Sequence, residues 1–161
     1  MRNLTSKISL MGLLFALAMA FSYLESMVTI PGMLPGIRLG LSNLVTMYCL
    51  FFLGKGAGYT MAVMKSLFVL LTRGFVAGLL SLSGGILSVT AILLVDWLTK
   101  RTLHYITLSV LGAVFHNVGQ LILARFLTSV FLYYYIPVLI LSGLVVGMLT
   151  GKIFVWICDS V

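Results

Sequence analysis

Long runs of apolar residues, almost free of charge, recur along this chain and constrain its fold more than any other feature. The clearest run extends from Phe75 to Leu98 and contains a single charged residue, Asp96. A helix needs about 20 such residues to cross the hydrocarbon core of a bilayer. Overall, 61% of the residues are hydrophobic and 8% are charged, whereas a soluble domain has about a quarter charged residues. The sequence therefore predicts a protein that lipid surrounds.

We predict one transmembrane domain over residues 1–161, an all-α bundle of about six transmembrane helices. A β-barrel is excluded because its strands would alternate lipid-facing and lumen-facing residues, and these runs are continuous. Two of the candidate spans are short and are separated only by Gly54-Lys55-Gly56, so five helices with one re-entrant segment is the alternative. The candidate spans are Ile8–Leu24, Leu39–Leu53, Gly56–Leu71, Phe75–Leu98, Tyr105–Leu132 and Ile136–Cys158.

The first run has the features of a signal peptide as well as those of a transmembrane helix. Basic residues precede it, and Ala16-Leu17-Ala18 resembles a cleavage site. We interpret it as the first transmembrane helix. Cytoplasmic loops are enriched in Lys and Arg, and placing both termini in the cytoplasm puts six basic residues inside and three outside. The inner residues are Arg2, Lys7, Lys55, Lys100, Arg101 and Lys152, and the outer ones are Arg38, Arg73 and Arg125.

The segment between the first two spans, Glu25–Gly36, is apolar but contains two Pro-Gly pairs. Pro and Gly interrupt regular structure, and irregular backbone at membrane depth must be shielded by protein or line a cavity. We expect an outer lid over a cavity. The alternative is a simple connector.

Small residues at four-residue spacing allow helix backbones to approach closely in lipid. Two such sets, on the first and third spans, predict a docking surface for another membrane protein, and packing within the bundle is the alternative for each. A third set, Gly143, Gly147 and Gly151, is interpreted as internal packing. The two docking sets are Gly12, Ala16 and Ala20 on the first span and Gly58, Ala62 and Ser66 on the third.

Several polar residues are predicted to lie at membrane depth, where a central Lys or Arg costs about 2.5–3.5 kcal/mol. Lys65 lies in the middle of the third span, and His116, Asn117 and Gln120 are predicted to share one face of the fifth, at positions i, i+1 and i+4. The outer half also contains an excess of cations over acids. We therefore predict a pocket for a ligand with a carboxylate or phosphate group. The predicted binding residues are Glu25, Arg38, Asn43, Lys65, Arg73, His116, Asn117 and Gln120.

The alternative is that each polar residue has a local role. Arg73 can extend to outer head groups, His116 and Asn117 can pair across helices, and Lys65 can pair with Glu25 or with a carbonyl.

Residue types that catalysis would require are missing from the sequence. The three acidic residues, Glu25, Asp96 and Asp159, are isolated, so we expect no metal site, and the sequence has no Walker or GxSxG motif. We expect no catalytic residue, no enzymatic activity and no cofactor. The net charge of +7 comes from scattered basic residues, which lipid and topology explain better than nucleic acid does.

Three sequence motifs stand out, and they are Pro35-Gly36-Ile37-Arg38-Leu39-Gly40-Leu41-Ser42-Asn43-Leu44-Val45-Thr46, Ser83-Gly84-Gly85-Ile86-Leu87-Ser88 and Phe115-His116-Asn117-Val118-Gly119-Gln120-Leu121. They resemble those of the Gx transporter family, which is also labelled heptaprenyl diphosphate synthase component I. This family is similar to the substrate-binding S components of energy-coupling factor (ECF) transporters. The resemblance implies a six-helix S component that binds a vitamin-like compound under the loop between its first two helices. It also implies docking, through the small-residue faces, onto a transmembrane coupling subunit that carries two ATPases.

We carry two hypotheses for function. The first is an S component of an ECF-type importer for a small anionic compound, like a vitamin or a precursor of isoprenoids or quinones. The second is a membrane subunit that transports nothing and binds quinone or prenyl compounds.

Overall fold

A computed structural model describes residues 4–27, 41–100, 102–127 and 136–160, and these residues form helices joined by short turns, with no strand among them. The helices are α1 (Leu4–Met27), α2 (Leu41–Tyr48), α3 (Lys55–Arg73), α4 (Phe75–Leu98), α5 (Tyr105–Leu127) and α6 (Ile136–Ser160), with a π-helical turn, η1 (Cys49–Leu53), after α2. Every predicted apolar run is helical over its described residues, which confirms the all-α prediction for this part of the chain.

Four helices, α1, α4, α5 and α6, are long and apolar enough to cross a membrane. The continuous helix formed by α2 and η1 is shorter, and its 13 residues span about 20 Å, less than the roughly 30 Å of a hydrocarbon core. The structure therefore supports four spans, and the total of about six remains a prediction. The structure supports a membrane protein with several apolar helices.

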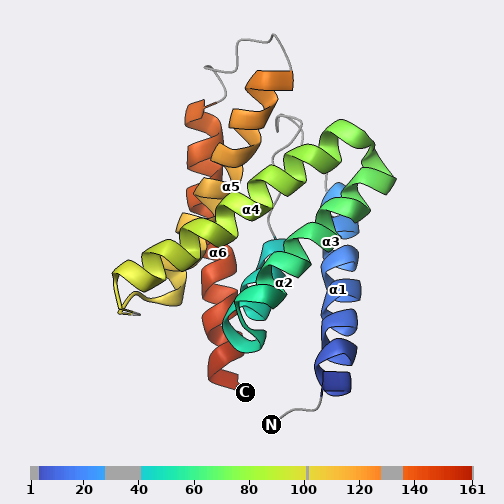
Figure 1. Ribbon diagram of the computed structural model, residues 1–161. Helices are drawn as coiled ribbons and strands as arrows, with labels where there is room; N and C mark the ends of the chain where they lie inside the picture. The colour runs from blue at the N-terminus through green and yellow to red at the C-terminus, as the bar shows by residue number, and fades with distance from the viewer. Residues whose placement is uncertain (1–3, 28–40, 101, 128–135, 161) are drawn as a thin grey trace.

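The helices alternate in direction along the bundle, so α1 begins and α6 ends at the same end of it (Figure 1). Two glycines with positive φ make the tight reversals. Gly54 (φ 108°) separates η1 from α3, and Gly74 (φ 93°) separates α3 from α4. Both conformations strain any residue that has a Cβ atom. The predicted hairpin around Gly54 is therefore present, with its turn at a single residue.

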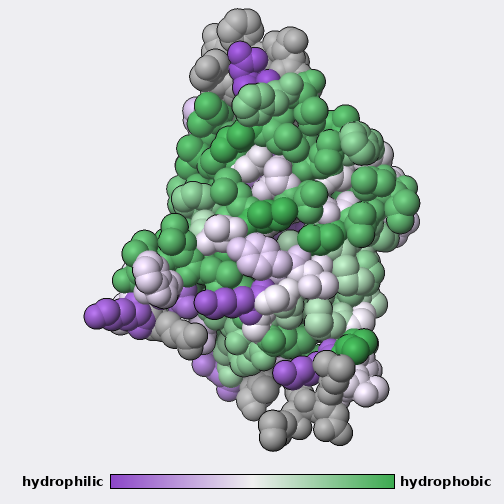
Figure 2. All heavy atoms as spheres, viewed as in Figure 1, coloured by the Kyte–Doolittle hydropathy of each residue, from purple (hydrophilic) through white to green (hydrophobic). Residues whose placement is uncertain are grey.

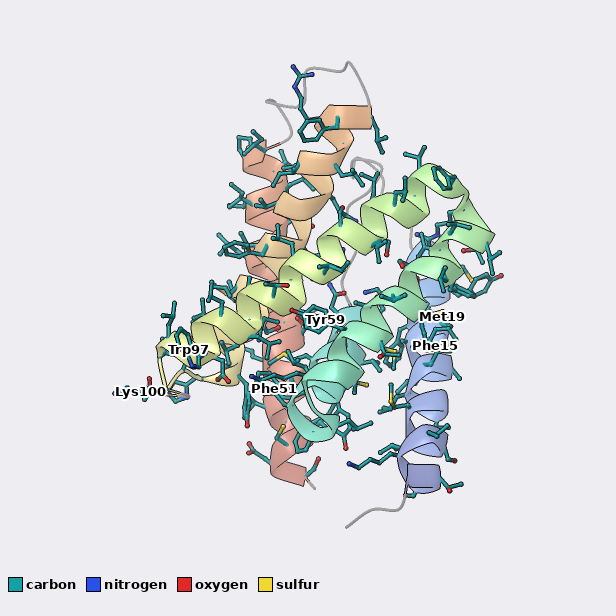
Figure 3. The ribbon with its side chains drawn as sticks, viewed as in Figure 1. Phe15, Met19, Phe51, Tyr59, Trp97 and Lys100 are labelled. Carbon is teal, nitrogen blue, oxygen red and sulfur yellow. The ribbon has the colours of Figure 1, made fainter. Side chains whose placement is uncertain are left out.

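Two groups of buried residues form the interior. One surrounds Leu108 and Phe154 and is contributed by α2 to α6, while the other joins Ala18 and Met19 of α1 to Val45, Cys49 and Met61. Phe15 and Met19 of α1 lie beside α3 in Figure 3. Many large apolar side chains on the outside are exposed, and they cover most of the face in Figure 2. Such a surface fits contact with lipid.

Glycines set the close packing of α4, α5 and α6. A Cβ atom at Gly119 would lie 2.9 Å from the Cα of Gly84, and one at Gly147 would lie 2.5 Å from the Cα of Val110. The backbones therefore approach as closely as glycine permits. Gly143 and Gly151 also face α5, which confirms the prediction that this set packs internally.

Candidate functional site

Lys65 lies on the inner face of α3, with 5% of its surface exposed. Its ammonium donates hydrogen bonds to the side-chain oxygen of Asn43, at 2.5 Å, and to the hydroxyl of Ser42, at 3.3 Å. Both acceptors belong to α2. Such bonds offset part of the desolvation cost of a buried ammonium. Lys65 is therefore linked to an amide and a hydroxyl of the neighbouring helix. The Glu25 side chain, the acid considered from the sequence, lies outside the described part of the structure.

His116 lies on α5 where this helix crosses α4. A Cβ atom at Gly84 would lie 2.9 Å from His116 Nδ1, so the imidazole rests directly against the α4 backbone. Nδ1 is buried and has no hydrogen-bond partner among the described residues. A buried polar atom without a partner is costly and uncommon. Only a glycine at position 84 leaves room for the ring in this place.

A cavity lies between α2, α3, α4, α5 and α6, and the predicted residues Asn43, Lys65 and His116 all line it. Its volume is about 30 Å³, which is room for one or two water molecules. The wall is polar at some positions and apolar at others. The remaining lining residues are Thr46, Met47, Leu50, Ala62, Gly85, Ser88, Val89, Ile92, Ser109, Gly112, Ala113, Val146 and Thr150.

The hydroxyl-bearing side chains of this wall were not predicted from the sequence. Ser109 and Thr150 join α5 to α6 with a 3.0 Å hydrogen bond, and Thr46 bonds back to the carbonyl of Ser42 at 3.4 Å. Ser and Thr commonly satisfy their hydroxyls in this way within membrane helices. Their sequence pattern therefore carries little information about which of them face a cavity.

Other predicted binding residues lie elsewhere. Asn117, next to His116, donates a 2.8 Å hydrogen bond to the carbonyl of Leu139 and so ties α5 to α6. Gln120 is half-buried and does not line the cavity. Arg73 ends α3 and donates a 3.0 Å hydrogen bond to the carbonyl of Ser22 on α1.

Two predicted residues and the predicted lid cannot be placed. Arg38 lies outside the described residues, as does most of the segment Glu25–Gly36. The backbone of Glu25 belongs to α1, but its side chain is outside the described part of the structure.

The two predicted docking faces differ in exposure. On α1, Gly12, Ala16 and Ala20 are exposed. On α3, the corresponding residues are buried within the chain: Ala62 is 1% exposed and faces Gly85 of α4, and the other two members of the set are Gly58 and Ser66. A docking surface must be accessible to its partner. The burial of the α3 set therefore fits the alternative given from the sequence, which is packing within the bundle.

The cavity has the chemistry of a site for a polar group within apolar surroundings. It combines one ammonium, one amide, one imidazole and several hydroxyls with aliphatic walls. Among the described residues, no group of three His, Cys, Asp or Glu side chains is placed to hold a metal ion.

The motifs that carry the family resemblance lie at these same positions. The first contains Asn43, the second contains Gly84 and Gly85, and the third contains His116. A family model described as heptaprenyl diphosphate synthase component I matches residues 14–155. The chain belongs to this family. The match includes every residue that lines the cavity. No curated protein and no solved structure matches the chain.

Proposed function

We propose that this member of the family is the substrate-binding S component of an ECF-type importer for a small anionic compound. The observation that supports this most is the convergence of Lys65, Asn43 and His116, from three different helices, on one interior cavity. Each of these groups is costly to bury. A bundle needs no such convergence for its stability, whereas a binding site does.

A ligand would use this arrangement by replacing existing hydrogen bonds. Its carboxylate or phosphate would accept from the Lys65 ammonium in place of Asn43 and Ser42. A charge-assisted bond is stronger than one to a neutral oxygen, so the exchange is favourable. The Asn43 amide would then be free to bond the ligand, and Nδ1 of His116 would gain a partner. The cavity of about 30 Å³ must widen to admit such a molecule.

Import needs an energy source, and the sequence has no Walker motif of its own. We propose that a transmembrane coupling subunit with two ATPase subunits supplies it. The exposed small-residue face of α1, formed by Gly12, Ala16 and Ala20, is the docking surface in this proposal. The chain would lie in the cell membrane with both termini in the cytoplasm, in keeping with the distribution of basic residues.

The family description names a synthase component, but we propose that this chain is not itself an enzyme. Prenyl synthases hold Mg²⁺ and diphosphate with aspartate-rich motifs, and the three acidic residues of this sequence are far apart in it. At most the chain would assist such an enzyme.

A second candidate function is a membrane subunit that binds quinone or prenyl compounds and transports nothing. The cavity wall favours it in one respect, because Met47, Leu50, Val89, Ile92 and Val146 supply aliphatic surface beside the polar groups. A prenyl diphosphate or a quinone combines an apolar part with a polar one and would fit the same mixture.

Co-purification distinguishes the two functions. The affinity-tagged chain would be extracted from its own cell membrane in mild detergent, and the proteins and small molecules that remain bound would be identified by mass spectrometry. The importer function predicts a coupling subunit with two ATPases. Recovery of the chain with bound quinone or prenyl compound and without those subunits would favour the second function.

A further inference from the structure

A cleft at the end of the bundle where α1 begins and α6 ends is separate from the interior cavity. It lies between the η1–α3 turn, the last turn of α4 and the start of α5, and it has two adjoining parts of about 280 and 330 Å³. Lys55, Leu93 and Asp96 line both parts. Trp97 and Lys100 are at the α4 end and Phe51 is on η1, as Figure 3 shows. No step of the proposed import uses these residues.

The outer part of the cleft is cationic. Lys55 and Lys100 are exposed and border it, so that its lining holds two ammonium groups and one carboxylate, that of Asp96. Asp96 lies on the same wall and has an interaction of its own. In Figure 2 the hydrophilic surface here adjoins the apolar surface of the bundle.

The inner part of the cleft is mostly apolar and aromatic. Phe51, Leu93, Leu103, Tyr105 and Leu108 line it. Phe51 and Tyr105 contact each other edge to face, with ring centroids 5.2 Å apart, and so form an aromatic part of this wall. Trp97, at the rim, is 72% exposed, and exposed Trp is typical of the level of lipid head groups.

We propose that this cleft binds an anionic phospholipid. Its phosphate lies between Lys55 and Lys100, and the upper part of one acyl chain follows the groove past Leu93, Leu103 and Phe51. Charge complementarity accounts for the first contact, because basic pockets between helices at a membrane surface attract anionic head groups. A soluble anion would use the lysines but would gain nothing from the adjoining apolar groove. The combination therefore points to a lipid.

The test uses Trp97 as a reporter. The sequence contains two tryptophans, and Trp156→Phe leaves Trp97 alone. This protein would be reconstituted in phosphatidylcholine vesicles that contain a minor fraction of either phosphatidylglycerol or phosphatidylcholine with brominated acyl chains. Bromine quenches tryptophan at short range, so brominated phosphatidylglycerol should quench Trp97 more than brominated phosphatidylcholine at the same fraction. Equal quenching by the two lipids, in protein that keeps both lysines of the cleft, would overturn the proposal.

Charge variants in the same background locate the effect. Lys55→Gln with Lys100→Gln should remove the preference for phosphatidylglycerol, with affinity falling roughly fivefold for each lysine. The matched control, Lys7→Gln with Lys152→Gln, removes two exposed lysines outside the cleft and should keep the preference. The proposal fails if the cleft variant keeps the preference or if the control loses it equally. The proposal also fails if the cleft variant keeps its preference for phosphatidylglycerol but no longer co-purifies with a protein that the wild-type chain retains.

Discussion

At the residue scale, the contacts that each polar side chain makes depend on which side of its helix faces inward. Consecutive residues of a helix point about 100° apart, so His116 and Asn117 cannot face the same neighbour. His116 faces α4 and the cavity, while Asn117 faces α6. The prediction that His116 and Asn117 share one face of the helix is therefore wrong, and the two residues contact different helices.

Alanine substitution of each of these two residues should have distinct effects. His116→Ala should weaken binding of the compound that the wild-type protein retains while the bundle still folds, because the imidazole lines the cavity and its Nδ1 has no partner among the described residues. Asn117→Ala should leave affinity unchanged and lower the free energy of unfolding by about 1 kcal/mol, as expected for one interhelical bond in a membrane. Calorimetry and thermal unfolding in detergent measure the two effects. The opposite pattern would exclude His116 from the site.

The sequence was sufficient to bring Lys65, Asn43 and His116 forward as candidates, because ionisable and amide side chains at membrane depth stand out. It could not indicate that Arg73 bonds to α1 or that Asn117 bonds to α6. Those outcomes depend on the rotation of each helix within the bundle. That rotation is set by close contacts such as Gly84 against His116, which no single helix reveals.

At the element scale, the hairpin between η1 and α3 depends on one backbone conformation. Gly54 has φ 108° and ψ 171°, which side chains rarely permit, while Gly56, two residues later, is helical with no atom near its missing Cβ. Position 54 therefore requires glycine, whereas position 56 can accept a residue with a Cβ atom.

Replacing each glycine by alanine tests this difference. Gly54→Ala should lower the free energy of unfolding by about 1–3 kcal/mol because the strained conformation must be kept or the turn rebuilt. Gly56→Ala should be neutral or stabilising by up to about 1 kcal/mol, since alanine favours helix. Thermal unfolding in the same detergent gives both values. Equal losses in the two variants would contradict the assigned turn.

The helices themselves were predictable, because each apolar run has helix-forming length and composition. Their internal irregularities were not. The π-helical turn η1 follows α2 without any sequence break, and its end is marked by the amide of Gly54 donating to the carbonyl of Cys49 at 3.1 Å. Propensity does not determine such internal boundaries. The predicted run from Tyr105 to Leu132 is helical as far as Leu127, and residues 128–132 lie outside the described part of the structure.

At the scale of the whole molecule, the proposed importer requires one exposed surface for a partner and one enclosed site for a ligand. α1 carries the exposed small residues, and the cavity lies among the other five helices. Mutations should therefore be able to abolish partner docking without affecting ligand binding, and the reverse.

A matched pair of alanine-to-leucine variants tests this separation. Ala16→Leu adds bulk on an exposed face and should leave stability unchanged while abolishing co-purification of the coupling subunit. Ala62→Leu adds bulk at a residue that is 1% exposed and faces Gly85, so it should cost about 1–3 kcal/mol of stability through overpacking. Thermal unfolding measures the stability of both variants, and a pull-down measures whether each retains the coupling subunit. Retention of the coupling subunit by Ala16→Leu would remove α1 as its docking surface.

The central claim is that the cavity around Lys65 holds a small anionic molecule, and native mass spectrometry of the full chain released from its own membrane tests it most directly. Wild-type protein should carry a bound small molecule, Lys65→Met should lose it while still folding, and Lys152→Met, a control at an exposed lysine of α6, should keep it. The same bound mass in wild-type protein and in Lys65→Met, or no bound small molecule in any of the three proteins, would contradict the account.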